Sequence, residues 1–555
     1  MIAELFRFRG GVKPAPHKDE SAGVPIRQAP LPDRLIVPLR QSAGAAAHPL
    51  VGAGDRVLKG QRIAAADGSF SSAVHAPTSG RVRAIEPHPL PHPSGLAAPC
   101  ALIEPDGEER WIDRTAFDWR AASADAVRDA LRDAGIVGLG GAAFPSHVKL
   151  RPGDAGRIET LLLNGAECEP WITADDRLMR ERAVDVLRGA LIMRHVVGAA
   201  RILVGIEDNK PQAIAALRAA ALQVGEAGLA IVPIPTLYPA GGEKQLIRVL
   251  TGIEIPYGKL GAQFGVQCFN VGTAHAVYRA IEHGEPLLSR VVTLTGNVER
   301  PGNFEVMVGT PIAALLPLAG PRADTDRVLM GGPMMGFALP SLEVPVVKAT
   351  NCVIAASPRL FPPPPPEMPC IRCGACARVC PAELQPMELY WFARAKNFGK
   401  AQEYHVFDCI ECGACSFVCP SGIPLVDYYR FAKSSMRARE REKSAADAAR
   451  ERFALRNLRS EREKEEKAAR LAARTAAGRA AATAAGAPPP AAGGADAEKK
   501  ALIAAAVERA RAQKQGITPR NIDNLAPEKS LEIAEIEARR KSLRAMAKTP
   551  PEEPV

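Results

Sequence analysis

Two copies of one cysteine motif constrain this chain more than any other feature. The first copy reads C-x2-C-x2-C-x3-C-P over residues 370–381, and the second repeats it over 409–420. With this spacing, three cysteines of one loop hold one [4Fe–4S] cluster, and the fourth points away to ligate the other cluster. Zinc sites favour cysteines in pairs and disulfide frameworks belong to small secreted domains, so neither fits a triplet with a trailing Cys-Pro. The motifs therefore predict two [4Fe–4S] clusters and a protein that carries single electrons.

The crossed arrangement predicts which cysteines hold each cluster. The first cluster is expected to take three cysteines of the first motif and the last cysteine of the second: Cys370, Cys373, Cys376 and Cys419. The second cluster is expected to take the complementary set: Cys409, Cys412, Cys415 and Cys380. Four further cysteines are interpreted as ordinary core thiols: Cys100, Cys168, Cys268 and Cys352. Iron–sulfur assembly together with free thiols indicates a reducing compartment.

Composition and charge limit the other possibilities. The chain has 555 residues, enough for about three to five domains of ~100–200 residues each. Its opening, MIAELFRFRGG, lacks the apolar segment of a signal peptide, and no uncharged apolar run reaches the ~18 residues of a membrane-spanning helix. The net charge of +10 raises the possibility of nucleic-acid binding, but much of it lies in the C-terminal tail and no nucleic-acid-binding module is found. We therefore expect no nucleic-acid partner.

An all-β module is predicted over 31–115, after a Pro- and Gly-rich arm at 1–30. Residues 51–87 contain short apolar runs separated by Gly and Pro, a pattern typical of hairpins. This stretch resembles the barrel-sandwich fold of biotinyl and lipoyl carriers, which place a modified lysine at a hairpin tip. The corresponding tip, 67–70, reads Asp-Gly-Ser-Phe and has no lysine, so we interpret the module as structural.

Alternating helices and strands over 120–285 predict an α/β domain with a parallel sheet. A helix at 123–134, capped by Ser123, leads into the loop GIVGLGGAAFP, whose glycines permit close approach to a phosphate or a planar ring. The alternative is a glycine turn that only packs helix against strand. Polar residues at the carboxyl end of the strand in 158–170 lie where α/β folds bind ligands. The other expected elements are helices and strands in alternation: 176–198, 201–207, 211–224 and 229–235.

Four motifs of this domain resemble, in the same order, those of the NADH- and FMN-binding subunit of respiratory complex I. GLGGAAFP (138–145) is similar to that family's GRGGAGFP, and NGAECEP (164–170) is similar to its N-A-D-E-x-E-P. YPAGGE (238–243) is similar to Y-x-x-G-E-E, and CFNVGTAHAV (268–277) is similar to I-N-N-V-E-T-L-A-N-V. Four positions depart from the family. Ala143 replaces a glycine and Ala166 replaces an aspartate, while Gly242 and Gly272 each replace a glutamate.

The resemblance implies a flavin site and a neighbouring dinucleotide site. FMN is implied to contact Gly138, Gly140, Gly141, Lys149, Asn164, Asn270 and Thr273. NADH stacked on the flavin is implied to lie near Phe144, Glu167, Glu169, Tyr238 and Glu243, with Gly241 completing the set. Aromatic faces suit a stacked dinucleotide, and a lysine suits the FMN phosphate. No side chain is expected to act as a nucleophile or obligatory general acid, because the redox chemistry belongs to the cofactors.

Three regions complete the chain. Residues 290–318 resemble the β-grasp module that follows the flavin domain in the same family, with an expected role in packing, and 286–357 are expected to comprise this module and a following loop. A linker at 358–369 contains five consecutive prolines, a stiff spacer of roughly 15 Å. This spacer allows the iron–sulfur domain at 370–433 either to swing between the flavin and a partner or to stay docked. The Ala-rich, charged tail at 434–555 is expected to be helical with a break at 486–495, or disordered; a tether to anionic lipid or a partner subunit is the alternative.

We therefore expect a multidomain α/β and α+β protein. Over about residues 1–430, the domain order resembles the C subunit of the Rnf-type ion-translocating electron transport complex. The resemblance implies a peripheral protein on the cytoplasmic side of the bacterial inner membrane, with membrane subunits and a ferredoxin-type donor or acceptor as partners. One alternative is the diaphorase subunit of a soluble hydrogenase or formate dehydrogenase, which should lack the β-module. The other, favoured by Ala166 and Gly242, is a non-enzymatic docking subunit with a degenerate flavin site.

Overall fold

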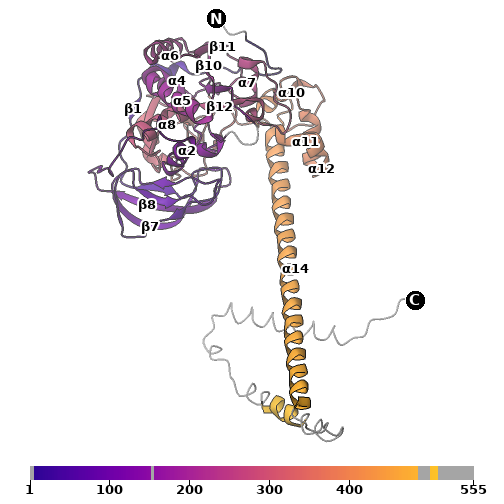
Figure 1. Cartoon of the computed structure of the whole chain (residues 1–555). Coiled ribbons are helices and arrows are strands. Elements are labelled where there is room, and N and C mark those ends of the chain that lie inside the picture. The colour runs from indigo at the N-terminus through magenta and orange to yellow at the C-terminus, as the bar shows by residue number, and fades with distance from the viewer. Residues whose placement is uncertain (1–4, 152–155, 485–500, 510–555) are drawn as a thin grey trace. The chain divides into compact units, whose positions relative to one another are not determined.

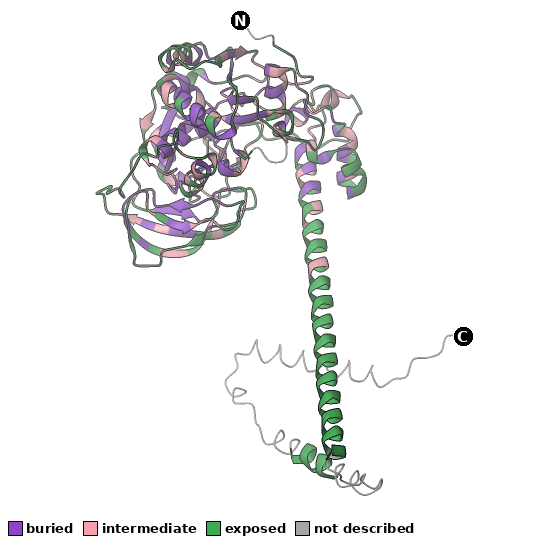
Figure 2. Cartoon of the chain, viewed as in Figure 1, coloured by how far each residue is buried: buried purple, intermediate pink, exposed green. Residues whose placement is uncertain are grey.

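The computed structural model describes residues 5–151, 156–484 and 501–509. The chain divides into two compact units, Met1–Ser444 and Ala445–Val555. Buried side chains occur throughout the first unit, whereas the described helix after Ser444 is almost entirely exposed (Figure 2). The helix break expected at 486–495 lies outside the described residues.

The N-terminal β-module is built from two small antiparallel sheets around one apolar core. Strands β2, β8, β7 and β4 form the first sheet in that order, and β3, β5 and β6 form the second. Their short apolar runs supply a core of fully buried aliphatic residues that includes Val37, Ile63 and Val82. The two sheets around a shared core confirm the predicted barrel-sandwich architecture. The strands are β2 (Leu35–Pro38), β3 (His48–Pro49), β4 (Arg56–Val57), β5 (Arg62–Ala65), β6 (Val74–His75), β7 (Gly80–Pro89) and β8 (Ala97–Pro105).

A four-stranded parallel sheet forms the α/β domain, with strand order β11-β10-β9-β12. Three of its strands, β10, β11 and β12, are labelled in Figure 1. The strands are β9 (Thr160–Asn164), β10 (Arg201–Glu207), β11 (Leu229–Ile234) and β12 (Val266–Asn270). Both β9 and β10 are apolar runs buried along nearly their whole length, as strands covered on both faces must be. The parallel sheet is therefore confirmed, and strand β10 has the predicted bounds.

The helices of this domain follow the predicted pattern with one correction. They are α2 (Ala124–Asp133), α3 (Ser146–Lys149), α4 (Ala174–Glu181), α5 (Ala183–Val197), α6 (Pro211–Val224), α7 (Glu243–Thr251), η2 (Gly261–Phe264) and α8 (Val271–His283). The predicted N-cap is confirmed, because the Ser123 side chain accepts from Ala126 N. The single helix predicted over 176–198 is wrong, because Arg182 leaves the helical conformation between α4 and α5. Its side chain pairs with Glu305 of the next domain, a contact that local sequence does not reveal.

The β-grasp region forms a six-stranded mixed sheet in the order β1-β14-β13-β17-β15-β16. Its elements are β13 (Ser289–Gly296), β14 (Gly302–Met307), α9 (Ile312–Leu315), η3 (Leu316–Ala319), β15 (Arg327–Met330), β16 (Phe337–Ala338) and β17 (Cys352–Ala356). The N-terminal arm contributes α1 (Asp19–Ala22) and β1 (Arg27–Gln28), and β1 pairs with β14 as an edge strand. The arm is therefore integrated into the sheet of a domain more than two hundred residues later.

Short helices carry the cysteine motifs of the iron–sulfur domain. They are α10 (Ala375–Arg378), α11 (Pro386–Arg394), α12 (Phe398–Glu403), η4 (Val406–Asp408) and α13 (Ala414–Phe417). The helix predicted over 386–398 ends at Arg394. The long helix α14 (Leu425–Ala484) crosses the expected tail boundary, and Lys433 near its start donates to Cys409 O at 2.7 Å. Of the two predicted alternatives for the tail, the helix is the one present as far as Ala484, and the first turns of α14 belong to the iron–sulfur domain.

Candidate functional site

Two asparagines mark the carboxyl edge of the parallel sheet. Asn164 ends β9 and Asn270 ends the neighbouring β12, and the two are direct register partners. Asn270 also caps α8, because its side-chain oxygen accepts from Gly272 N and Thr273 N at 2.8 and 3.3 Å. Its amide nitrogen donates to Asp175 at 2.6 Å. Strand ends of this kind are the usual ligand position in parallel α/β sheets, so the predicted flavin residues from two motifs meet there.

The Gly-rich loop lies over this edge. Leu139 N donates to the Thr273 hydroxyl at 2.9 Å, which joins the loop to the start of α8. A Cβ placed on Gly140 would lie 3.4 Å from Asn270 Cβ, so the loop backbone approaches the asparagine closely. Gly141 has a φ of +108°, and a Cβ placed there would meet no atom within 4 Å, so the loop apex faces open space. A bare backbone facing open space, with amides opposite, suits a flat ring system such as a flavin.

Two further contacts join the remaining motifs. Lys149 Nζ lies 2.6 Å from Glu243 Oε2, so the predicted phosphate ligand and the predicted dinucleotide residue are neighbours. Asn164 donates its amide to Gly241 O at 2.8 Å. The four motifs that resemble the NADH- and FMN-binding subunit therefore converge on one site, with a cation, amides and glycines on its surface.

Three residues predicted near NADH already have partners within the protein. The carboxylate of Glu167 accepts from Asp175 N and Asp176 N at the start of α4, at 2.7 and 3.1 Å. Glu169 accepts from the backbone amides of 334 and 335. Tyr238 donates its hydroxyl to Cys412 O at 2.6 Å. These side chains hold the loops of the site in place and, for Tyr238, join it to the iron–sulfur domain.

Lys18 is a residue that sequence reasoning missed. It lies in the N-terminal arm, is only 9% exposed, and donates to Glu167 O at 2.8 Å and Glu169 O at 2.9 Å. A third hydrogen bond goes to Ile172 O. Burial lowers the pKa of Lys18, while the nearby Glu167 carboxylate opposes that change; burial likewise raises the pKa of Glu167. One buried ammonium thus organises the loop 164–172.

The Gly- and Met-rich loop at 328–336, for which the sequence offers no chemical role, contacts both halves of the protein. Its Met334 and Met335 amides bind Glu169. A Cβ on Gly332 would lie 2.0 Å from Glu169 Cγ, so this position admits only glycine. On its other side, a Cβ on Gly413 would lie 2.4 Å from Met334 O. The loop therefore packs between a flavin-domain motif and a cysteine motif.

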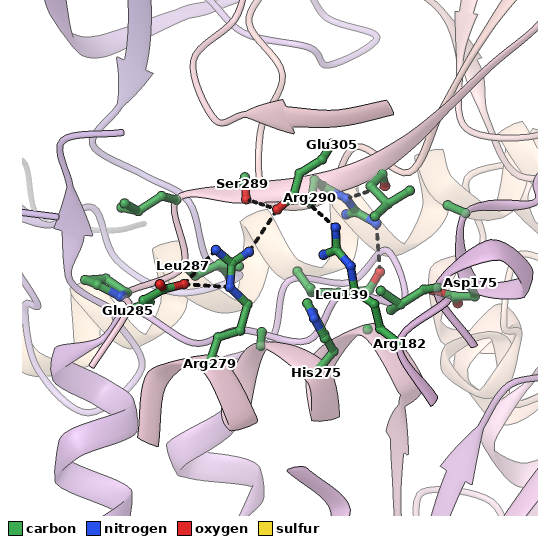
Figure 3. Close-up of a pocket in the computed structure, with 17 residues that line it drawn as sticks. Leu139, Asp175, Arg182, His275, Arg279, Glu285, Leu287, Ser289, Arg290 and Glu305 are labelled. Atoms are coloured by element: carbon green, nitrogen blue, oxygen red, sulfur yellow. Dashed lines mark hydrogen bonds and ion pairs between the residues drawn. The ribbon is translucent and has the colours of Figure 1, made fainter. Parts of the chain in front are cut away.

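A pocket lined by charged residues lies behind the Gly-rich loop, between α4, α8 and the β-grasp strands (Figure 3). Arg279 bridges Glu285 and Glu305, and Arg182 also binds Glu305. Burial alone would raise the pKa of Glu305, but Arg182 and Arg279 hold it well below its usual range. Arg290 donates to Leu139 O and so holds the backbone of the Gly-rich loop. Because Glu285 and Glu305 are paired with Arg182 and Arg279, and Arg290 donates to backbone carbonyls, we interpret the pocket as a structural junction beside the flavin site.

The eight motif cysteines line two separate cavities. One cavity is lined by Cys370, Cys373, Cys376 and Cys419. The other is lined by Cys409, Cys412, Cys415 and Cys380. Within the described ranges, no three side chains of His, Cys, Asp or Glu are arranged to ligate a single metal ion. Each cavity is thus bordered by three cysteines of one motif and the last cysteine of the other, the four residues that the sequence predicts for one cluster.

The iron–sulfur domain packs directly on the flavin domain. Besides the Tyr238 contact, Gln245 donates to Pro381 O at 3.1 Å, and Lys244 pairs with Asp408 at 3.1 Å. Tyr238 and Cys412 also belong to one buried apolar cluster with Val12. Of the two arrangements that the proline linker allows, these contacts favour the docked one.

Family comparisons match four successive parts of the chain. Residues 6–108 match the RnfC barrel sandwich hybrid domain, and 131–279 match the Nuo51 FMN-binding domain. Residues 291–338 match the SLBB domain, and 369–423 match the 4Fe-4S dicluster domain. The fold and these matches define the class: a protein that combines an FMN-binding domain with a 4Fe-4S dicluster domain.

Curated relatives narrow the class to one family. Several relatives are named as the C subunit of an ion-translocating oxidoreductase complex. The protein from Pseudomonas aeruginosa is 51% identical to this chain, and the alignment covers 93% of this chain and 66% of that protein. The protein from Serratia proteamaculans is 50% identical, and the alignment covers 73% of this chain and 57% of that protein. The Salmonella gallinarum protein of the same name is 48% identical over 84% of this chain and 69% of its own length. The chain belongs to this family, the C subunits of ion-translocating oxidoreductase complexes. It spans somewhat less than two thirds of the length of the first two relatives.

One solved structure, of an NAD+-reducing [NiFe]-hydrogenase, aligns with 56% of this chain and 61% of its own chain, at a TM-score of 0.41 and 21% identity. Across the described part of the chain, none of the helices combines the length and apolar character needed to cross a membrane.

Proposed function

We propose that this chain exchanges electrons between NADH, FMN and two [4Fe–4S] clusters. The observation that carries the proposal is the contact between its two halves. Tyr238 lies in a motif similar to a dinucleotide-binding motif, and its hydroxyl binds the backbone carbonyl of the cluster cysteine Cys412. A flavin site and a cluster site that share a buried contact are close enough to form one electron path.

The flavin site is proposed to use the residues that converge at the sheet edge: Gly138, Gly140, Gly141, Lys149, Asn164, Asn270 and Thr273. The glycine backbone offers a face for the ring, the asparagines offer amide groups, and Lys149 offers a cation for the phosphate. Phe144, Gly241 and Glu243 are proposed to contact the dinucleotide, whereas Glu167, Glu169 and Tyr238 fix the loops around it. FMN, when bound, supplies the conversion between two-electron exchange with NADH and one-electron exchange with a cluster.

The two clusters are proposed to act in a fixed order. Cys412 and Cys415 are each only 7% exposed, and the Cys412 segment contacts the flavin domain through Tyr238. Around the other cavity, Cys373 is exposed and Ile371 is 68% exposed. The cluster of Cys380, Cys409, Cys412 and Cys415 is therefore the inner one, next to the flavin, and the other is the outer one, which is available to a partner.

The names of the relatives suggest the partners and the cellular location of this chain. Because the relatives are named as subunits of an ion-translocating oxidoreductase complex, we propose that membrane subunits of such a complex bind this chain. A ferredoxin-type protein is the proposed external donor or acceptor. The proposed location is the cytoplasmic face of the bacterial inner membrane, held peripherally. The match of residues 6–108 to a barrel sandwich domain argues against the diaphorase alternative, which should lack this module.

Substitution at Gly141 separates the proposal from the docking-subunit alternative. Gly141→Val places a branched side chain at a φ of +108°, in the open space reserved for the ring. We expect loss of bound FMN and of NADH-dependent reduction of an artificial acceptor, with iron content unchanged. Gly107→Val is the matched control, because Gly107 also has a positive φ, +77°, with open space around it, but lies in the β-module. Full activity of the Gly141 variant, or wild-type protein that binds no flavin, would favour the docking subunit.

A further inference from the structure

The hairpin tip of the β-module, between β5 and β6, contacts the α/β domain, although residues 67–70 remain exposed. Arg132 of α2 donates to Gly68 O at 2.9 Å, and His147 Nε2 lies 3.0 Å from Ser69 O. Lys348 donates to Ala73 O at 3.3 Å. The tip is thus held by Arg132 and His147, which flank the Gly-rich loop, and the segment after the tip is held by Lys348 of the β-grasp region.

Phe70 is the side chain that this tip presents to the loop. Its ring meets the Phe144 ring edge-on, with 6.1 Å between centroids and an interplanar angle of 75°. Phe70 nevertheless remains 55% exposed. A large aromatic side chain that is held in position but left half open retains a face for another flat group.

A second loop of the β-module, which contains Ala43 and Gly44, contacts the backbone of Phe70. A Cβ on Gly44 would lie 1.2 Å from Phe70 O, so the two backbones are in direct contact. Ala43, beside that glycine, donates its N–H to Ala143 O of the Gly-rich loop at 3.0 Å. The two β-module loops therefore form one support that touches the Gly-rich loop at Ala143 and Phe144.

We propose that Phe70 is a dinucleotide-binding residue and that, together with Phe144, it contacts the adenine ring of NADH. This inference rests on the proposed NADH function. NADH has two flat rings, and its nicotinamide must lie on the flavin at the strand ends. The adenine ring then needs a separate surface, and a pair of aromatic side chains at the outer end of the loop supplies one. The β-module, which lacks a carrier lysine, thereby contributes to the ligand site of the next domain.

Binding of ADP-ribose to the flavin-loaded full chain tests the inference without turnover, because this ligand contains the adenine end of NADH and no nicotinamide. We expect Phe70→Ala to weaken ADP-ribose binding about tenfold in calorimetry, as loss of one stacking contact would. Phe70→Tyr should bind like wild type. Leu50→Ala is the matched control, since Leu50 is 54% exposed on the same module and should leave binding unchanged. FMN and iron content should be equal in all variants.

Gly44→Val provides a second test, because it displaces the Phe70 backbone while leaving the phenyl group present. It should weaken ADP-ribose binding as Phe70→Ala does. If wild-type protein binds NADH and ADP-ribose but Phe70→Ala binds ADP-ribose within twofold of wild type, the inference is overturned and the proposed function stands. If wild-type protein binds neither ligand, the proposed function fails and the inference fails with it.

Discussion

Replacing Lys18 by methionine should destabilise the flavin domain from a position in the N-terminal arm. Methionine fills a similar volume but removes the ammonium that donates to the carbonyls of Glu167, Glu169 and Ile172. A buried acceptor left without a donor costs about 1–3 kcal/mol, so three such carbonyls give a loss of at least about 3 kcal/mol. For a domain of this size, such a loss lowers the melting temperature by about 6–12 °C.

Differential scanning fluorimetry of the purified holoprotein measures this shift, and flavin released on gel filtration reports whether loop 164–172 still shapes the site. Lys13→Met is the matched control, because Lys13 lies on the same arm and is exposed. We expect the Lys18 variant to melt earlier and to lose FMN, and the Lys13 variant to behave as wild type. Equal melting temperatures and equal FMN retention in both variants would refute the organising role of Lys18.

The other predictions concern the clusters, the tail and pH. Cys380→Ala should damage the cluster held by Cys409, Cys412 and Cys415, and Cys419→Ala should damage the cluster held by Cys370, Cys373 and Cys376. Electron paramagnetic resonance can assign the damaged cluster in each variant. If each substitution instead damages the cluster held by the other three cysteines of its own motif, the crossed assignment of ligands is wrong. Truncation after Ser444 should leave iron and FMN content unchanged, whereas truncation after Pro424, which removes Lys433, should reduce iron content; equal iron in both would show that α14 does not support the clusters. Burial lowers the pKa of Lys348 to about 7 from 10.5. Between pH 7 and 10.5, Lys348 is protonated in the unfolded chain but not in the folded chain. The free energy of unfolding should therefore rise with pH by at most about 1.4 kcal/mol per pH unit. The melting temperatures of the wild type and of Lys348→Met at pH 7 and pH 9 test this expectation. The same change of melting temperature with pH in both proteins would contradict the role of Lys348.

Sequence patterns were sufficient where the controlling interactions are local. The alternation of apolar runs and helical segments predicts the parallel sheet, and Ser123 was recognisable as an N-cap from its position before α2. The cysteine spacing predicts the two sets of four that line the cavities. In each case the signal is a local pattern in the sequence: the spacing of apolar residues, a residue just before a helix, or a cysteine spacing with one known geometry.

The residues that sequence reasoning missed act across long separations. Lys18 precedes Glu167 by 149 positions, and Arg290 follows Leu139 by 151. No local pattern marks a lysine in an arm as a ligand for three distant carbonyls. The break at Arg182 likewise has no local signal, and the side chain of Arg182 pairs with Glu305 on a strand of another domain. The site is thus recognisable from its motifs, but its supports are visible only in the folded chain.

Freeze-quenched electron paramagnetic resonance after mixing the anaerobic holoprotein with NADH tests the central claim most directly. The Cys380→Ala and Cys419→Ala variants assign the signals of the inner and outer clusters. The account predicts that NADH reduces both clusters within turnover, and that the signal of the inner cluster, held by Cys380, Cys409, Cys412 and Cys415, rises first. Clusters that stay oxidised in the presence of NADH, or an outer cluster that is reduced before the inner one, would contradict it.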